Sequence, residues 1–164
     1  MSIGGHHTTA STRDEWLTPP EILLPLCSFD LDPCASIQRP WPTATRHLTV
    51  EDDGLSHEWS GRVWLNPPYG SQTAHWLDRM ADHNDGIALV FARTETAMFF
   101  SHVWLRATAM LFLEGRLHFC SVEGFRASGN AGAPSVLIAY GEDNAEILRA
   151  SGLRGAFVSE WTVR

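Results

Sequence analysis

Apolar runs bounded by turn residues recur along this chain and predict the strands of a buried sheet. The clearest run is 86–92, Gly-Ile-Ala-Leu-Val-Phe-Ala, which has no charged side chain. The same pattern predicts strands at 63–65, 109–113 and 135–140, short strands at 29–32 and 47–50, and one or two more within 155–163. Because amphipathic stretches fall between these runs, the pattern favours an α/β fold with helices packed on a sheet.

The predicted helices begin at residues that can cap them. Thr18 stands before Pro19, a residue suited to the first helical position, and Glu21 completes a capping box three residues after Thr18. We expect this first helix to end near Leu26. Further helices are expected at 72–83, after a cap at Thr94 or Thr96, and at 142–151.

The segment that follows the strand at 109–113 is expected to form a hairpin arm at 116–119 and then a mobile loop. This loop, 121–134, is rich in glycine, alanine and serine. A loop of this length in a compact domain is often a lid or a binding loop. Phe125 and Arg126 would suit base stacking and phosphate contact, and a disordered connector is the alternative.

The composition is that of a soluble chain with one domain, since 44% of its 164 residues are hydrophobic and 19% are charged. We expect a disordered tail at 1–12 and the domain at 13–164. No apolar stretch approaches the ~20 residues of a membrane span, and the first residues do not form a signal peptide. Three cysteines without a pairing pattern predict a reducing cytoplasm, and no spacing of histidine or cysteine predicts a metal site.

The charge gives a mixed indication about partners. A net charge of −7 argues against a surface that coats nucleic acid generally. All 12 basic residues are arginine, the side chain that contacts phosphate and guanine through paired donors, so a local basic cleft is compatible with this charge. Genomic base composition explains the missing lysines equally well.

The most informative stretch is Asn66-Pro67-Pro68-Tyr69, directly after a predicted strand. The prolines cannot donate to a strand ladder, so the strand must end there, at the edge of an open sheet where ligands bind. The Asn66 side-chain oxygen and the Pro67 carbonyl can both accept hydrogen bonds from an amino group, and the Tyr69 ring can stack on a flat π-system. A proline-rich turn with Tyr69 packed on the core is the alternative.

Other polar residues stand at the ends of predicted strands or in turns. Asp32 closes a short strand, a common arrangement for binding a nucleoside or an amino-acid moiety. Asp53 lies in an acidic turn, for which a solvated turn closed by Gly54 is the alternative. Arg93 follows a central strand and is expected at the same edge as Asn66, with a surface ion pair as the alternative.

Four motifs in this order resemble the phage-type DNA N6-adenine methyltransferases, the phage Dam-like family. They are Trp-x-Thr-Pro-Pro from Trp16, Asp-x-Asp-Pro-Cys-Ala from Asp30, Asp-Gly-Leu from Asp53 with Trp59 after it, and Leu-Asn-Pro-Pro-Tyr from Leu65. The resemblance implies one α/β domain with a truncated, Rossmann-like methyltransferase sheet and flanking helices. It implies transfer of a methyl group from S-adenosylmethionine to N6 of a flipped adenine in double-stranded DNA. The location implied is the cytoplasm of a bacterial host, for a phage or prophage product.

The resemblance and the positions above also give each of these residues a predicted role. None of them is expected to bind a metal ion. The catalytic residues would be Asn66, Pro67, Pro68 and Tyr69. The cofactor-binding residues would be Trp16, Thr18, Pro19, Asp30, Asp32, Pro33, Cys34, Ala35, Asp53 and Leu55. The substrate-binding residues would be Tyr69, Arg93, Arg116, Phe125 and Arg126.

Some features leave alternatives open. Most S-adenosylmethionine enzymes carry a glycine-rich loop after their first strand, whereas residues 32–36 contain no glycine. The short distance from Asp32 to Asn66 predicts that one strand–helix unit is missing or reduced. An RNA guanine-amino or protein glutamine-amide methyltransferase is an alternative enzyme, because these also use Asn-Pro-Pro-Tyr. A catalytically silent DNA- or protein-binding relative is a rival of another class, and nothing indicates the oligomeric state.

Overall fold

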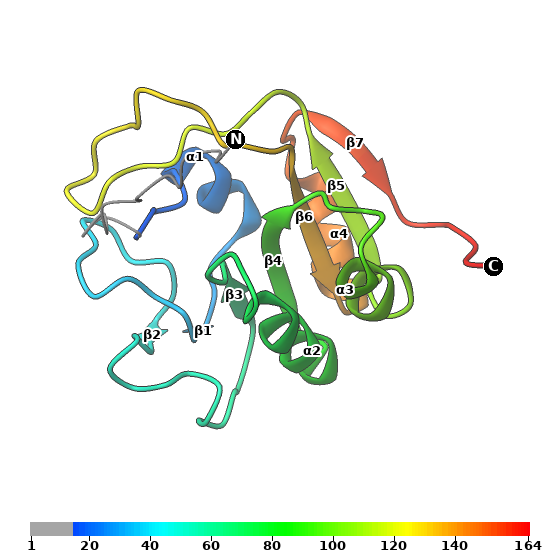
Figure 1. The fold of residues 1–164 in the computed structure, drawn as a ribbon, viewed down its shortest axis with the longest axis horizontal. Coiled ribbons are helices and arrows are strands. Elements are labelled where there is room, and N and C mark those ends of the chain that lie inside the picture. Colours follow the sequence, from blue (N-terminus) through cyan, green and yellow to red (C-terminus); the bar gives the residue numbers. More distant parts are fainter. Residues whose placement is uncertain (1–14) are drawn as a thin grey trace, which may run out of the picture.

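A computed structural model describes residues 15–164 as one α/β domain built on a seven-stranded mixed sheet (Figure 1). The strand order is β2-β1-β3-β4-β6-β5-β7. The predicted α/β fold with flanking helices is therefore confirmed. The predicted disordered tail at 1–12 lies outside the described residues.

The sheet has a parallel half and an antiparallel half. Its parallel half consists of β1 (Leu31–Asp32), β2 (Arg46–His47), β3 (Val63–Leu65) and β4 (Gly86–Phe91). Its antiparallel half consists of β5 (Ala109–Leu113), β6 (Ser135–Tyr140) and β7 (Gly155–Val158), with β6 inserted between β4 and β5. The carboxyl ends of the four parallel strands therefore meet at one edge of the sheet.

Helices cover both faces of this sheet. They are α1 (Pro20–Leu23) with a 3-10 turn η1 (Leu24–Leu26), α2 (Thr73–His83), α3 (Ala97–Phe99) with a π-helical turn η2 (Phe100–Trp104), and α4 (Glu142–Ala150). The core is split accordingly: α2, α3 and η2 pack on one face, and α1, η1 and α4 pack on the other. Within residues 15–164, no helix is long and apolar enough to cross a membrane.

Strand β3 shows how the two faces are filled. Val63 and Leu65 belong to the cluster that contains Leu77 of α2, whereas Trp64 belongs to the cluster that contains Ile22 of α1. This alternation follows from the two-residue period of a strand. All three β3 residues are buried, so the residue that follows Leu65 starts from a fixed position.

The side of the sheet formed by β1 and β2 is reduced, as predicted. Strands β1 and β2 have two residues each, and the structure shows no helix between β1 and β3. The second short strand is Arg46–His47, so the expected strand at 47–50 was misplaced. Long loops replace the missing helix, and Figure 1 shows them at the end of the molecule away from β7.

Two predicted local features are wrong. No hairpin arm forms at 116–119, because β6 and β7 already occupy both edges of β5. The Leu117 and Phe119 carbonyls accept from the amides of Ala131 and Ala127, and Cys120 forms isolated bridges with Leu17 and Arg126. The capping box at Thr18 is also absent: α1 begins at Pro20, and its N-terminus has no side-chain cap.

Of the two threonines that could cap α3, Thr94 and Thr96, the structure shows that Thr96 is the cap. The Thr96 hydroxyl accepts a hydrogen bond from the Phe99 amide at 3.2 Å. A single α-helical turn then widens into the π-helical turn η2, which packs against α2.

Arg62 anchors the amino end of β3 by joining elements from both halves of the chain. Its guanidinium donates to Asn144 Oδ1 of α4 at 2.6 Å and to the carbonyls of Leu26 and Ser28 at 2.6 and 2.9 Å. It also lies over the Phe29 ring, 4.1 Å from the ring centroid. The Arg62 guanidinium therefore hydrogen-bonds to carbonyls at the end of η1 and links α4 to the start of β3.

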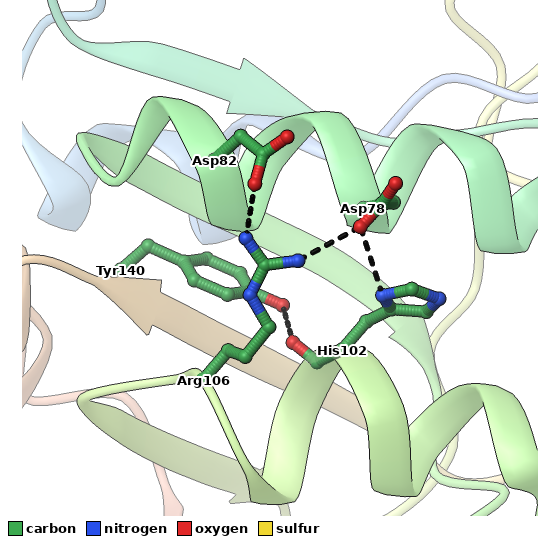
Figure 2. A network of polar contacts seen from close by, with 5 residues as sticks. All are labelled: Asp78, Asp82, His102, Arg106 and Tyr140. Carbon is green, nitrogen blue, oxygen red and sulfur yellow. Dashed lines mark hydrogen bonds and ion pairs between the residues drawn. The ribbon is translucent and has the colours of Figure 1, made fainter.

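A second arginine joins α2 to η2 at the surface, as Figure 2 shows. Arg106 donates to Asp78 at 2.8 Å and also to Asp82, while His102 Nδ1 lies 3.4 Å from Asp78. The Tyr140 hydroxyl donates to the His102 carbonyl at 2.7 Å. Because both aspartates are largely exposed, water screens these ion pairs.

The two arginines should differ in their contribution to stability. Arg62→Ala should lower the free energy of unfolding by about 3 kcal/mol, because it leaves buried acceptors without a donor. Arg106→Ala should lower it by at most about 1 kcal/mol, as expected for exposed ion pairs. Urea denaturation of both variants measures the difference, and equal losses would contradict the role given to Arg62.

Candidate functional site

A cavity of about 860 Å³ lies at the carboxyl edge of the parallel half of the sheet. Its walls come from four segments, 15–18, 32–36, 49–54 and 64–69, with a few side chains from elsewhere. Asp32 is the last residue of β1 and Asn66 directly follows β3, so both reach the cavity from neighbouring parallel strands. This is the position at which open α/β sheets bind ligands.

The structure brings most of the predicted site residues together. All four predicted catalytic residues line the cavity. The predicted cofactor-binding residues that line it are Trp16, Thr18, Asp32, Pro33, Cys34, Ala35 and Asp53. Pro19, Asp30 and Leu55 do not line it, nor do Arg93, Arg116, Phe125 and Arg126.

Asn66 presents an acceptor with no partner. Its Nδ2 donates to Thr18 Oγ1 at 3.3 Å, while its Oδ1 is buried and accepts no hydrogen bond from any residue in 15–164. Buried polar atoms are nearly always paired, and Asn66 lines the cavity, so its unpaired oxygen is a candidate acceptor for a ligand donor. The side chain is therefore arranged to receive an N–H or O–H group.

Tyr69 forms a stacked pair that the sequence did not reveal. Its ring lies parallel to that of Phe91, with centroids 4.1 Å apart and an interplanar angle of 2°. Tyr69 remains 44% exposed and lines the cavity, so part of this residue is accessible to a ligand. Phe91 ends β4, and only the pairing of β3 with β4, Leu65 opposite Ala88, shows that it reaches the same edge.

Thr73 holds the turn that carries Tyr69. Its hydroxyl donates to the Pro68 carbonyl at 2.8 Å and accepts from the Gly70 amide at 3.1 Å. Thr73 is buried at the first turn of α2, so the turn is tied to a helix that packs on the sheet. The proline residues and this hydroxyl together fix the direction of the chain after β3.

Asp32 is a buried carboxylate with two donors. It is 4% exposed, and it accepts from the Cys34 amide at 3.0 Å and from the Thr43 hydroxyl. Burial raises the pKa of Asp32 to about 6, although both hydrogen bonds and nearby Arg39 oppose that rise. Burial and the neighbouring Asp32 raise the pKa of the Cys34 thiol to about 12, so Cys34 is a neutral side chain and not a nucleophile.

Position 54 requires glycine because a side chain would not fit there, and not because its backbone conformation favours glycine. A Cβ at Gly54 would lie 1.8 Å from the Pro33 carbonyl oxygen, whereas the positive φ of this turn, 55°, falls on Asp53. The Trp59 indole donates to the Gly54 carbonyl at 2.8 Å and stacks on Trp76. Gly54 therefore lets the acidic turn lie directly against the segment that follows Asp32.

Three residues predicted to bind the cofactor lie outside the cavity. Asp30 is at the other end of β1, where its carboxylate accepts from the Arg62 amide at 2.7 Å. Pro19 is buried at the start of α1, and Leu55 packs on the core. Their predicted roles stay predictions, without support from the cavity.

The predicted substrate-binding residues other than Tyr69 lie on the surface. Arg93 is exposed just after β4, so it shares the carboxyl edge with Asn66. Phe125 is 73% exposed, and Arg126 beside it is also exposed. Arg116 donates to the Ala131 carbonyl at 3.1 Å, across the base of the same loop.

The charged side chains that line the cavity are mostly acidic. They are the carboxylates of Glu15, Asp32 and Asp53 and the guanidinium of Arg39. Such a lining favours a cationic ligand over a phosphorylated one. Within the described part of the chain, no three side chains of histidine, cysteine, aspartate or glutamate gather to form a metal site.

Comparison with known proteins gives one family. The family described as DNA N-6-adenine-methyltransferase (Dam) matches residues 5–152, which include every segment that lines the cavity. No curated protein and no solved structure matches the chain.

The buried carboxylate should make stability depend on pH. Because the pKa of Asp32 is about 6 in the folded protein and 3.8 ordinarily, its ionisation opposes folding above pH 6 by about 3 kcal/mol. Asp32→Asn should therefore be more stable than the wild type at pH 8, and the difference should vanish near pH 4. Urea denaturation across this range measures it, with exposed Glu95→Gln as control. A difference that grows as the pH falls would contradict the raised pKa.

The close approach at Gly54 should make this position intolerant of any side chain. Gly54→Ala should lower the free energy of unfolding by about 1–3 kcal/mol, as overpacking does. Gly129→Ala is the matched control, because nothing lies within 4 Å of a Cβ at Gly129. Thermal unfolding compares the two variants, and equal effects would show that the contact with Pro33 is unimportant.

Proposed function

Since the chain belongs to the Dam family of DNA N-6-adenine-methyltransferases, we propose that it transfers a methyl group from S-adenosylmethionine to N6 of an adenine flipped out of DNA. The family supports the reaction class and the DNA substrate. The cofactor, base flipping and residue roles rest on the geometry of the cavity.

The free acceptor of Asn66 is the observation that carries the proposal. The N6 amino group of adenine is a hydrogen-bond donor, so it complements a buried amide oxygen that has no protein partner. An amide is neither acidic nor basic at neutral pH, so Asn66 would orient the amino group and stabilise its developing charge. Positioning of this kind can remove ~7–11 kcal/mol from the barrier of a reaction between two molecules.

The stacked pair gives the extruded base a surface to lie on. Phe91 covers one face of Tyr69 and fixes the orientation of its ring. A flipped adenine would stack on the other face, which replaces part of the stacking that it loses in the duplex. The turn at 66–69 would thus hold the base by its face and by its amino group.

The cavity suits S-adenosylmethionine by charge and by shape. When bound, this cofactor supplies an electrophilic methyl group on a positively charged sulfur. The acidic lining favours such a cation, and a positive charge near Asp32 would favour its ionised form. The contact of Gly54 with Pro33 shapes the wall beside Asp32. A volume of about 860 Å³ lies within the range of small-molecule sites and leaves space beside a cofactor.

The chain would contribute orientation and exclusion of water to the transfer. As the nitrogen–carbon bond forms, the carbon–sulfur bond would break and S-adenosylhomocysteine would leave as a neutral thioether, while N6 would gain positive charge and then lose a proton to solvent. The Asn66 oxygen would stabilise this charge as the acceptor of an N6 hydrogen. The Cys34 thiol, with its raised pKa, would not compete with N6 for the methyl group.

DNA would contact the exposed residues around the cavity. Arg93, Arg126 and Phe125 are exposed near the carboxyl edge or on the loop beside it. Because the net charge is −7, phosphate contacts would be few and local. Binding should therefore depend less steeply on salt than for a generally basic protein.

The family match supports adenine in DNA over an RNA guanine or a glutamine amide as the substrate. A catalytically silent DNA- or protein-binding relative would keep the fold but would not bind S-adenosylmethionine. Calorimetric titration with S-adenosylmethionine separates this alternative, because only the proposed enzyme should release or absorb heat that saturates at one site per chain.

Removal of the acceptor or of the stacking ring should lower activity. Asn66→Ala should lower kcat by at least about 100-fold, as loss of a group that stabilises developing charge does. Tyr69→Ala should weaken use of DNA by about 10- to 100-fold, because stacking of one base is lost. The assay is transfer of tritium from labelled cofactor to unmethylated DNA, followed by nucleoside analysis.

Two matched controls define the result. Tyr69→Phe should retain most activity, since stacking needs the ring and not the hydroxyl, and exposed Asn130→Ala should behave as wild type. Full activity of either alanine variant at Asn66 or Tyr69, or label in a nucleoside other than N6-methyl-2′-deoxyadenosine, would refute the proposal.

A further inference from the structure

Arg39 is the one basic side chain among the described residues that line the cavity. It is partly buried and comes from the loop between β1 and β2, outside the four sequence motifs. Three carboxylates, those of Glu15, Asp32 and Asp53, line the same cavity. An acidic lining suits a cationic ligand, so the presence of one cation in it calls for a reason of its own.

The guanidinium of Arg39 has donors to spare. It donates to the Ser36 carbonyl at 2.6 Å and makes no other hydrogen bond within the described chain. A guanidinium carries five N–H groups, so several of them are left for a ligand. Arg39 also forms no ion pair with a described carboxylate, whereas Arg106, Arg149 and Arg154 each form one.

Arg39 and Asp32 act on each other without contact. The charge of Arg39 lowers the pKa of the Asp32 carboxyl, against the larger effect of burial, so the two groups lie near each other. In the part of the chain that the structure describes, however, Asp32 accepts its hydrogen bonds from Cys34 and Thr43 and forms no ion pair with Arg39. A cation and an anion that line one cavity without touching leave a place for a ligand that carries both charges.

We propose that the Arg39 guanidinium binds the α-carboxylate of S-adenosylmethionine, which leaves the carboxylates of the cavity for the cationic groups of this cofactor. The inference rests on the proposed function, because it assigns a residue to the amino-acid end of the same cofactor. An arginine suits this task, since its planar guanidinium can donate two parallel hydrogen bonds to one carboxylate.

The loop that carries Arg39 is fixed at both ends. Before Arg39, the Ala35 amide donates to the Leu48 carbonyl at 2.8 Å. After it, the Thr43 amide donates to His47 Nε2 at 3.2 Å. Both acceptors belong to β2 or directly follow it. Because the loop is tied twice to the sheet, less conformational freedom is lost when its arginine binds a ligand.

Two other roles for Arg39 predict different effects of its removal. If Arg39 only supports its loop through the Ser36 carbonyl, its removal should weaken the binding of every ligand of the cavity. If it contacts a DNA phosphate, its removal should weaken DNA binding and leave the cofactor affinity unchanged. Only contact with the cofactor carboxylate makes the effect depend on that one group of the ligand.

Calorimetric titration with two ligands, without DNA and without turnover, tests the contact. S-adenosylmethionine and decarboxylated S-adenosylmethionine differ by the carboxylate alone. The wild type should bind the decarboxylated ligand about 10- to 100-fold more weakly, the loss typical of hydrogen bonds between charged groups. Arg39→Gln should weaken S-adenosylmethionine by a similar factor and should bind the decarboxylated ligand within about twofold of the wild type, or more tightly. The preference for the carboxylate should therefore disappear.

Two further variants serve as controls. Arg39→Lys keeps the charge and loses the paired donors, so it should retain part of the preference. Arg46 is exposed on β2 and does not line the cavity, so Arg46→Gln makes the same change in net charge and should behave as wild type. Equal weakening of both ligands in Arg39→Gln, or an unchanged preference, would overturn the inference. A wild type that binds both ligands equally well would overturn it without any variant.

These titrations also separate the two proposals. If the preference is present in the wild type and lost in Arg39→Gln, yet no label reaches DNA, the proposed reaction fails and the carboxylate contact stands. If the wild type methylates DNA and Arg39→Gln keeps the preference, only the contact fails. If the wild type binds neither ligand, both proposals fail.

Discussion

The site depends on one buried oxygen that the folded chain leaves without a partner. An unpaired buried acceptor costs about 1–3 kcal/mol, so it persists only where the surrounding structure forces it. Three features do so for Asn66. The preceding strand is buried on both faces, the following residues are prolines, and the Thr18 hydroxyl occupies the donor end of the amide. A substrate amino group would recover the lost hydrogen bond, which turns a folding cost into a preference for one kind of ligand.

A strand of only three residues can carry such a site because both of its ends are fixed. Arg62 ties the amino end of β3 to α4 and to the end of η1. The Thr73 hydroxyl ties the turn after the carboxyl end to α2. Since α2 and α4 pack on opposite faces of the sheet, movement of β3 along its axis or across the sheet would break one anchor or the other. The stacking of Tyr69 on Phe91 adds the neighbouring strand β4 to this support.

Local patterns predicted the parts of this structure that local physics determines. The long apolar runs became β4, β5 and β6, and the prolines after Leu65 ended β3 where expected. Thr18 shows where such reasoning fails: its spacing to Glu21 fits a capping box, yet the hydroxyl pairs with a residue 48 positions later. Contacts of this kind depend on which distant segments lie side by side, such as β3 beside β4, and no local pattern contains that information. The same reason hid the stacking of Tyr69 on Phe91.

The absence of glycine after β1 also has a structural answer. A glycine in such a loop lets another group come close to the backbone. Here the glycine lies on another segment: Gly54 packs against the Pro33 carbonyl, where a Cβ would be 1.8 Å from the oxygen. The acidic turn can approach this closely because no helix separates β1 from β3 in the described chain. The missing helix and the close approach of Gly54 therefore occur together in this half of the sheet. The shortened half of the sheet keeps a closed wall beside Asp32 by packing loop on loop, and Trp59 holds that loop in place through the Gly54 carbonyl.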